Sequence, residues 1–410
     1  MKRRVVITGM GAITPVGNTL EETWENLVKG VSGIDTITRF DPSELPTQIA
    51  AQVKDFKPEE HFDPKEARKL DIYTQFALVA SREAIADAGL EGFDPERVGV
   101  ITGVGIGGIE TFEEECYKAH TKGPRRISPF FIPKMIGNIA AAHIAIENNF
   151  QGPNFSVMSA CASANHALGT AMRTIQYGDA DIIVSGGTEG AVTPLAVGGF
   201  CAMRALSTRN DDPQGASRPF DSERDGFVMS EGSAFLVLEE LEHAKARGAK
   251  IYAELAGFGA TDDAFHITAP TEDGSGSARA MRAAISDAGL TPTDIQYINA
   301  HGTSTPLNDK GETQSIKTVF GDYAYEVKIS SSKSMVGHML GAAAAIEAIV
   351  CVKTIQTGII HPTINLDNPD PLCDLNYVPH KAIEQKVDAC LSNSLGFGGH
   401  NSAIVIRRYS

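Results

Sequence analysis

The residues best suited to chemistry begin with one cysteine among small neighbours. Cys161 lies in SACASANHALG (159–169), directly after the run NFSVM and before a segment that predicts a helix. A sulfur atom near a helix N-terminus faces unpaired backbone N–H groups, which favour the thiolate and lower its pKa. The pattern therefore indicates a nucleophile, with a small buried core residue as the alternative.

Two histidines in the second half of the chain could act with this cysteine. His301 directly follows an apolar strand, in the turn NAHGTSTPLND (299–309), and His338 lies in SKSMVGHMLGAAAAIE (332–347), where we expect a helix to start. The carboxyl ends of strands are where α/β proteins assemble their sites. We interpret His166, one helical turn beyond Cys161, as structural rather than as a base.

A lysine and a glycine-rich turn complete the candidates. Burial of Lys333 would require a carboxylate partner, for which Glu312, Glu347 and Asp309 are available. We expect Lys333 to position or tune the site electrostatically. The turn NSLGFGGHN (393–401) can bring backbone N–H groups close to a ligand.

An internal duplication indicates which elements position these residues. ITGMGAIT (7–14) matches LAGFGATD (255–262), and AIADAGL (84–90) matches AISDAGL (284–290). SACASANHALG is aligned with SSKSMVGHMLG (331–341), which pairs Cys161 with Lys333 and His166 with His338, each 172 residues apart. The simplest explanation is two alike halves, residues 1–250 and 251–410.

Each half alternates short apolar segments with amphipathic ones, as βαβ units do. The fold class is therefore α/β, with two mostly parallel halves related by a pseudo-twofold axis. Two segments, 112–138 and 207–226, read as excursions from this frame, and we expect functional loops there.

Composition narrows the class of protein. With 42% apolar residues the chain can bury a large core, and a formal net charge of −15 argues against nonspecific nucleic-acid binding. The longest apolar run, GAAAAIEAIVCV, is too short to cross a bilayer, and no cleavable signal is evident. Six cysteines without CxxC spacing indicate neither disulfides nor zinc. We expect a cytoplasmic protein without membrane insertion.

Four motifs in register, SACASANHALG, NAHGTSTPLND, SSKSMVGHMLGAA and NSLGFGGHN, with VGGF, RALSTRND and SRPFD (197–221) between them, closely resemble the elongating β-ketoacyl-acyl-carrier-protein synthases. The class II enzymes are the best match. The resemblance covers nearly the whole chain and implies the duplicated, αβαβα-layered thiolase fold with five strands in each half. It also implies fatty-acid elongation by decarboxylative condensation, without a redox cofactor or essential metal.

The resemblance also implies roles for individual residues. Cys161 would carry the acyl chain as a thioester, with the oxyanion held by the backbone N–H groups of Cys161 and Phe397. His301 and His338 would donate hydrogen bonds to the thioester oxygen of malonyl carrier protein, and Phe397 would gate the cysteine. Further matched positions are Ile106, Phe200 and Phe131 in the acyl pocket, Phe131 coming across a homodimer interface, and Thr303, Thr305 and Thr268 along the pantetheine arm.

The implied partner, acyl carrier protein, is acidic like this chain, so a local basic patch must overcome the repulsion. Lys65, Arg68 and Lys69 have helical spacing. Arg125, Arg126 and Arg204 match docking positions of the family. Ordinary solvated side chains are the alternative for each of these six residues.

Three other functions share this fold. A thiolase would carry a second catalytic cysteine in the GFGGHN loop, which has none. A non-catalytic chain-length factor would lack the nucleophile, whereas Cys161 and both histidines are present. A polyketide synthase relative is separated less well by motifs alone. The small departures from the family, CASAN after the nucleophile and Leu395 and His400 near the gating loop, bear on chain-length preference.

Overall fold

The computed structural model describes residues 2–410, and its centre is a ten-stranded sheet in the order β10-β9-β13-β14-β8-β1-β7-β6-β4-β5. Its strands are β1 (Val5–Ile13), β4 (Val98–Gly103), β5 (Asn154–Val157), β6 (Ile182–Glu189), β7 (Gly232–Glu240), β8 (Ala253–Asp262), β9 (Tyr297–Asn299), β10 (Lys328–Ser330), β13 (Ala389–Gly396) and β14 (His400–Arg407). Outside this sheet β2 (Ile34–Thr36) pairs with β3 (Ile49–Ala51), and β11 (Ile359–Ile360) pairs with β12 (Ile383–Glu384).

The sheet consists of two five-stranded halves with the same topology. Read outward from the middle, β1-β7-β6-β4-β5 mirrors β8-β14-β13-β9-β10. In each half the second strand, β7 or β14, is antiparallel to its neighbours, and the other four strands share one direction. The halves meet where Val6 and Ile7 pair with Glu254 and Ala253. This arrangement confirms two mostly parallel halves related by a pseudo-twofold axis.

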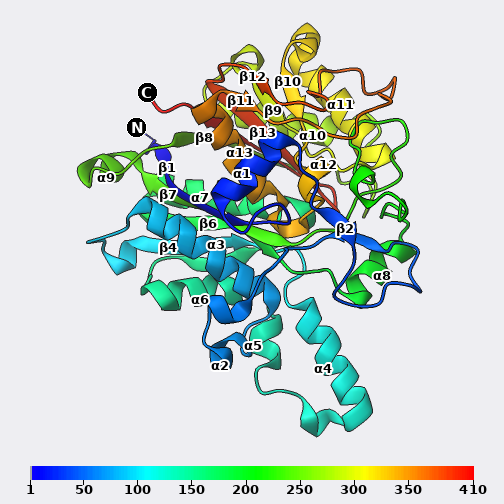
Figure 1. The fold of residues 1–410 in the computed structure, drawn as a ribbon. Coiled ribbons are helices and arrows are strands. Elements are labelled where there is room, and N and C mark those ends of the chain that lie inside the picture. The colour runs from blue at the N-terminus through cyan, green and yellow to red at the C-terminus, as the bar shows by residue number, and fades with distance from the viewer. Residues whose placement is uncertain (1) are drawn as a thin grey trace.

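Helices form three layers around these halves (Figure 1). The helices are α1 (Leu20–Lys29), α2 (Pro64–Ala67), α3 (Ile72–Ala88), α4 (Ile109–Lys122), α5 (Phe131–Met135), α6 (Ile139–Asn148), α7 (Ser163–Tyr177), α8 (Pro194–Ala202), α9 (Leu241–Ala246), α10 (Ser275–Asp287), α11 (Pro306–Phe320), α12 (Lys333–Val336) and α13 (Ala343–Thr357). α3 packs on the first half and α10 on the second, while α7 and α13 contact strands of both. The order of layers is therefore αβαβα.

The central position of α13 explains its composition. By length and composition the segment Leu340–Thr357 could span a membrane. The shorter apolar run considered in the sequence did not indicate this. However, 83% of the segment is buried inside the protein. Such burial is what a core helix between two sheets requires.

The first two internal matches are confirmed by close packing of strand on helix. A Cβ added at Gly9 of β1 would lie 2.2 Å from the carbonyl oxygen of Ala84 in α3. At Gly257 of β8 a Cβ would lie 2.2 Å from the carbonyl oxygen of Ala284 in α10. Glycine is needed at both places because the helix backbone touches the strand backbone.

The third match is wrong in register. The 3-10 turn η4 (Ala160–Ala162) that begins α7 has its counterpart in η8 (Leu340–Ala342), which begins α13. Ala160 and Leu340 both have positive φ, 50° and 46°, and both helices are 15 residues long. Cys161 therefore corresponds to Gly341, with an offset of 180 rather than 172. Nine residues, 331–339, separate β10 from η8 and include α12, whereas only two, 158–159, separate β5 from η4.

The first predicted excursion, 112–138, forms most of α4 and all of α5, which protrude together as a lobe at the lower end of the molecule (Figure 1). The second, 207–226, contains no helix longer than the three-residue turn at Pro213–Gly215. It packs against the loop that follows β9, as described below.

Candidate active site

Cys161 lies in η4, between the end of β5 and the start of α7, and is 9% exposed. Its carbonyl oxygen accepts a hydrogen bond of 2.8 Å from the Ser394 hydroxyl of β13. A Cβ at Gly396 would lie 2.5 Å from the Ser159 carbonyl oxygen, so β13 of the second half touches the nucleophile turn of the first. This contact brings the N–H of Phe397, the next residue, toward the sulfur.

Burial dominates the electrostatics of the Cys161 thiol. It raises the pKa of Cys161 to about 12, while the nearby Lys333 charge and the backbone N–H groups of Phe397 and Cys161 act in the opposite direction. The lowered pKa expected from the helix N-terminus is therefore wrong for the unliganded site. At neutral pH the sulfur is a thiol, and its proton must leave during acyl transfer.

The two histidines meet as predicted. The rings of His301 and His338 lie 5.4 Å apart between centroids at an interplanar angle of 85°, and both are 3% exposed. Burial, with a further contribution from the Lys333 charge, holds the pKa of each well below its usual value. Both imidazoles are therefore neutral at pH 7, and each has one N–H to donate.

The setting of His338 differs from the prediction in one respect. His338 lies in an extended segment between α12 and α13, rather than at the start of a helix. Its backbone N–H donates to Val228 at 2.8 Å, and its carbonyl accepts from Ser230 at 3.0 Å. These two hydrogen bonds fix the main chain that carries the His338 imidazole.

Lys333 is paired with Glu347, one of the three carboxylates considered from sequence. The two side chains form an ion pair, and each is 1% exposed. Burial raises the pKa of the Glu347 carboxyl, and the Lys333 charge opposes that rise. The positive charge of Lys333 is thus held close enough to Cys161 and the two histidines to act on their pKa values.

Glu312 and Asp309 have other partners. The two carboxylate oxygens of Glu312 accept the backbone N–H groups of His301 and Gly302, each at 2.8 Å. Asp309 accepts the N–H of Phe220 at 2.9 Å. Glu312 therefore supports the loop that carries His301, whereas Asp309 binds the 207–226 segment at Phe220 and Arg224.

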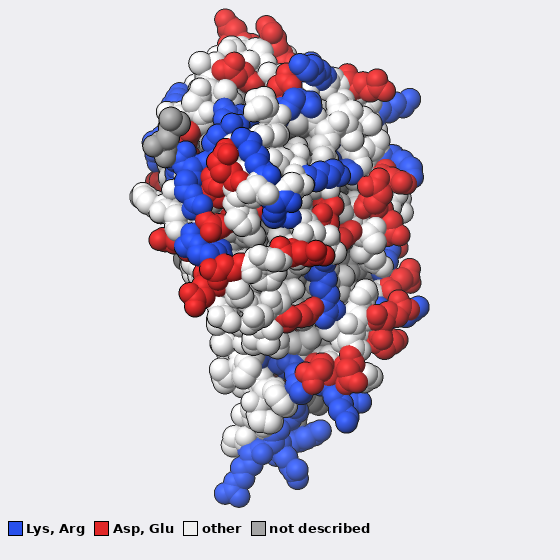
Figure 2. Space-filling model, turned by 90° about the vertical axis from the view of Figure 1, so that its left-hand side faces the viewer, with Lys and Arg blue, Asp and Glu red and all other residues white. Residues whose placement is uncertain are grey.

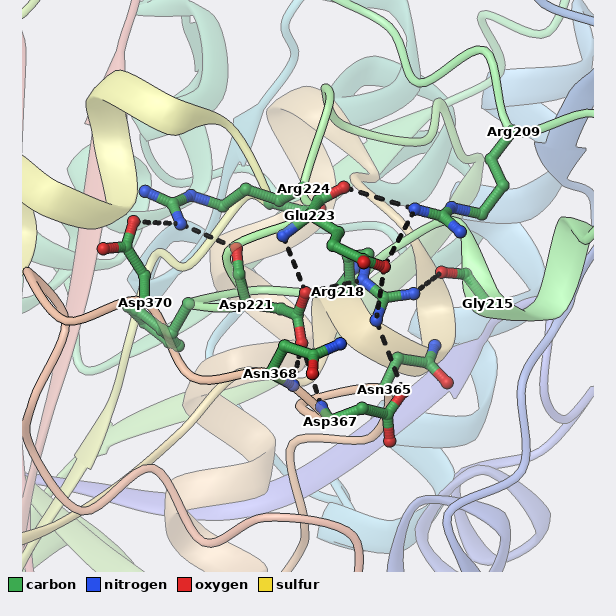
Figure 3. Close-up of polar contacts among 12 residues, drawn as sticks. Arg209, Gly215, Arg218, Asp221, Glu223, Arg224, Asn365, Asp367, Asn368 and Asp370 are labelled. Carbon is green, nitrogen blue, oxygen red and sulfur yellow. Dashed lines mark hydrogen bonds and ion pairs between the residues drawn. The ribbon is translucent and has the colours of Figure 1, made fainter.

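A buried arginine network that the sequence reasoning missed joins the 207–226 segment to residues 365–370 (Figure 3). The same network also holds the loop that carries His301. The Arg224 guanidinium donates to the carbonyl oxygens of Thr305 at 3.3 Å and Pro306 at 3.1 Å, and forms a 2.7 Å ion pair with Asp370. Arg218 pairs with Asp221 at 2.9 Å. Arg218, Asp221 and Arg224 belong to the 207–226 excursion, whose density of charge in SRPFDSERDG was the available signal.

The catalytic candidates open onto one cavity of about 360 Å³. The predicted residues that line it are Ile106, Cys161, Phe200, Arg204, Thr268, His301, Thr303, Thr305, His338 and Phe397. The hydroxyls of Thr303 and Thr305 lie 2.9 Å apart. The Phe397 ring lies 6.4 Å from that of Phe200, and both rings line the cavity together with Cys161.

The remaining predicted residues lie elsewhere. Phe131 is in α5 of the protruding lobe, 6.5 Å from the Phe112 ring, and does not line this cavity. Arg125 and Arg126 are exposed at the tip of the lobe, where basic side chains gather at the lower end of the molecule (Figure 2).

The helical spacing expected for Lys65, Arg68 and Lys69 is only partly present. α2 ends at Ala67, because Arg68 is already its C-cap residue. Lys69 forms an ion pair of 2.7 Å with Glu66, and Lys65 and Arg68 are exposed. The segment is one helical turn followed by a bend, rather than a longer basic helix.

A buried cysteine faces two backbone N–H groups, two neutral histidines and a lysine–glutamate pair inside a duplicated α/β frame. These features define a condensing enzyme of thiolase-like fold. The chain belongs to the β-ketoacyl synthase family: residues 2–244 match the family's N-terminal domain and residues 252–367 its C-terminal domain.

Curated relatives cover the full length. The chain is 51% identical over 409 residues to 3-oxoacyl-[acyl-carrier-protein] synthase 2 of Staphylococcus aureus strain N315, covering 99% of each sequence. The identity to the protein of the same name from Coxiella burnetii is also 51%, with 99% of each covered.

Solved structures agree over the whole chain. A ketosynthase of a type II polyketide synthase, solved with its acyl carrier protein, has a TM-score of 0.92 at 38% identity. A β-ketoacyl synthase from Burkholderia phymatum has a TM-score of 0.92 at 37% identity. Each comparison covers 100% of both chains.

Proposed function

We propose that Cys161, His301 and His338 perform the two half-reactions of fatty-acid chain elongation in this enzyme. The enzyme joins a Cys-bound acyl chain to malonyl-acyl carrier protein and releases CO₂ and 3-oxoacyl-acyl carrier protein. The observation that carries the residue assignment is the convergence of these three side chains on one cavity.

In the first half-reaction the Cys161 sulfur attacks the acyl thioester carbonyl. The negative charge that develops on the carbonyl oxygen is stabilised by the N–H groups of Cys161 and Phe397, which already face the sulfur. The C–S bond to pantetheine breaks, and its departing thiolate can take the proton that the Cys161 thiol releases. This transfer leaves an acyl-enzyme and a free carrier thiol.

In the second half-reaction malonyl-acyl carrier protein occupies the same cavity. His301 and His338, both neutral, donate to its thioester oxygen, where enolate charge develops as CO₂ leaves. The resulting carbanion attacks the acyl-Cys161 carbonyl, and the cysteine sulfur is expelled as a thiolate, which takes up one proton from solvent to restore the thiol. These steps balance without an oxidant or a reductant, and we propose that no cofactor is required.

The assembly and location are part of the same proposal. β5 is an edge strand of the central sheet, and the neighbouring side chains of Phe155 and Met158 are 40% and 59% exposed. An open edge with apolar side chains favours pairing with a second copy. We propose a homodimer formed there, and light scattering of the purified chain tests it.

We propose that the enzyme is cytoplasmic. All six cysteines are free thiols, which fits the reducing conditions of the cytoplasm.

We also propose that acyl carrier protein docks at the mouth of the cavity. Arg204 is exposed and lines the cavity there, so it can meet an acidic partner despite the negative net charge of the chain. Lys65, Arg68, Lys69, Arg125 and Arg126 remain candidates for the wider contact. Charge reversal at Arg68 and Lys69 is expected to raise KM for carrier-bound substrates, and an unchanged KM removes them from the surface.

Incubation with acyl-acyl carrier protein, read by intact-protein mass, tests the nucleophile directly. The wild-type chain is expected to gain one acyl mass, and Cys161→Ala is expected to gain none. Addition of malonyl-acyl carrier protein should then remove that mass and yield the extended product. Absence of the acyl mass in the wild-type chain contradicts the proposal.

A further inference from the structure

Glu189, the last residue of β6, is a fully buried carboxylate that the two half-reactions do not use. Its Oε2 accepts the backbone N–H groups of Gly105 at 2.9 Å and Gly341 at 3.1 Å. Its Oε1 accepts those of Ile106 and Gly107, each at 3.2 Å. Four main-chain donors thus converge on one side chain, and they come from both halves of the protein.

The pseudo-twofold symmetry shows which feature of the first half corresponds to the contact between Glu189 and Gly341. Gly341 in η8 is the counterpart of Cys161 in η4, and each lies at the N-terminal turn before a 15-residue helix. The N–H of Cys161 faces the place where substrate oxygen becomes negative. The N–H of Gly341 instead donates to the Glu189 carboxylate, so in the second half a resident anion occupies the equivalent place.

The segments held by Glu189 form one wall of the cavity next to Cys161. Gly105, Ile106 and Leu340 all line the cavity, and Leu340 directly precedes Gly341. Ile106 and Leu340 also belong to the apolar cluster around Cys161. A Cβ at Gly341 would lie 2.1 Å from the Gly105 nitrogen, so the two segments are in direct backbone contact.

We propose that Glu189 is a positioning residue that fixes the acyl side of the cavity by holding the Gly105–Gly107 segment against the Gly341 turn. The inference rests on the proposed role of Cys161 as the acyl carrier. It predicts that Glu189 sets how well an acyl chain is accommodated after it reaches the sulfur, while decarboxylation at the histidines depends on it much less.

Burial raises the pKa of the Glu189 carboxyl to about 7, against the four N–H donors that favour its charged form. The same carboxylate also acts to raise the pKa of Cys161. A carboxylate so close to a thiol that must lose its proton has an electrostatic cost for the reaction. A carboxylate at this position is explained if its four hydrogen bonds are needed to hold the wall of the cavity.

Glu189→Gln tests the inference with little change in volume. An amide replaces one oxygen by an NH₂ group, so two of the four N–H groups lose their acceptor. Misplacement of the wall by about 1 Å can cost up to about a hundredfold in rate. We expect kcat/KM for acylation of Cys161 by acyl-acyl carrier protein to fall about tenfold or more for chains of 12 to 16 carbons. The expected fall is about threefold or less for four carbons and for malonyl decarboxylation.

Glu83→Gln is the matched control. The Glu83 carboxylate also binds two backbone N–H groups, those of Ala12 at 2.8 Å and Leu20 at 3.0 Å, but it does not line the cavity. We expect it to lower the melting temperature without changing the dependence on chain length. An equal loss at every chain length in Glu189→Gln overturns the inference, because it indicates only a structural role.

Hydrogen exchange on the wild-type enzyme provides a test that needs no variant. The amides of Gly105, Ile106, Gly107 and Gly341 should exchange as slowly as those of the core strands, before and after acylation. Rapid exchange at these amides also overturns the inference. If the wild-type chain is not acylated at Cys161, the proposed function fails instead, so the two failures are distinguishable.

Discussion

Lys333 and Glu347 form a buried pair whose partners can be removed one at a time or together. Burial already raises the pKa of Glu347 to about 7, and in Lys333→Met the carboxyl also loses the one charge that opposes this rise, so it is neutral at pH 7. Holding a carboxyl neutral at pH 7, when its usual pKa is 4.5, costs about 3.4 kcal/mol at about 1.36 kcal/mol per pH unit. Breaking a buried ion pair typically costs about 3 to 5 kcal/mol, which agrees with this value.

The double variant Lys333→Met, Glu347→Leu removes both charges and fills the space with apolar groups. We expect its free energy of unfolding at pH 7 to be close to that of the wild-type enzyme and about 3 kcal/mol above that of Lys333→Met. Urea denaturation measures the difference. In the single variant the folded state holds one proton more than the unfolded state above pH 4.5, so its stability falls as the pH rises. The difference between single and double variants should therefore shrink to about 0.8 kcal/mol at pH 5.

Activity should separate from stability in the double variant. Lys333 lowers the pKa values of His301 and His338 and acts to lower that of Cys161. Without Lys333, both histidines take up a proton at a higher pH. As the pH is lowered, condensation should therefore begin to decline at a higher pH than in the wild-type enzyme. A difference in stability that does not change between pH 5 and pH 7, or a double variant with the wild-type pH profile, refutes this reasoning.

Three further predictions concern the parts that hold the site. Gly396→Ala places a Cβ 2.5 Å from the Ser159 carbonyl oxygen and displaces the Phe397 N–H, so the rate of Cys161 acylation should fall about 10²- to 10³-fold by mass spectrometry, with the circular dichroism spectrum unchanged. Arg224→Gln loses a charged anchor on the Thr305 and Pro306 carbonyls, and KM for both carrier-bound substrates should rise about tenfold, whereas Arg209→Gln should leave KM unchanged. Because the pKa values of both histidines are lowered, decarboxylation of malonyl-acyl carrier protein by the wild-type enzyme should be constant between about pH 6 and 8, and an acid limb near pH 6.5 contradicts this.

Sequence reasoning predicted the duplicated frame because local packing leaves a local signal. Glycine is needed at positions 9 and 257 because a helix carbonyl oxygen touches the strand at each of them. In both halves the strand motif is followed along the chain by the motif of the helix that touches it. Cys161, His301 and His338 also stand out locally, since each is near the end of an apolar segment. Their convergence on one cavity follows from the topology that the repeats predict.

The parts that sequence reasoning missed depend on distant contacts or on burial. Glu189 binds residues 84 and 152 positions away, and its own motif, GGTEG, has no feature that indicates four N–H donors. The pKa of Cys161 depends on desolvation by both halves, which outweighs the favourable helix position. The register of the third match is wrong because similar letters in SSKSM conceal the longer connection between β10 and η8, which contains α12.

The two ends of the chain lie side by side (Figure 1), with Arg4 stacked on the Tyr409 ring at 5.9 Å. Arg4 and Arg407 both bind the carboxylate of Glu254, on the strand that begins the second half. Start, middle and end of the chain therefore meet at one place. The molecule is close to a ring of two units that share one topology and is cut once, so the order of the two units along the chain does not decide how the nucleophile and the histidines meet.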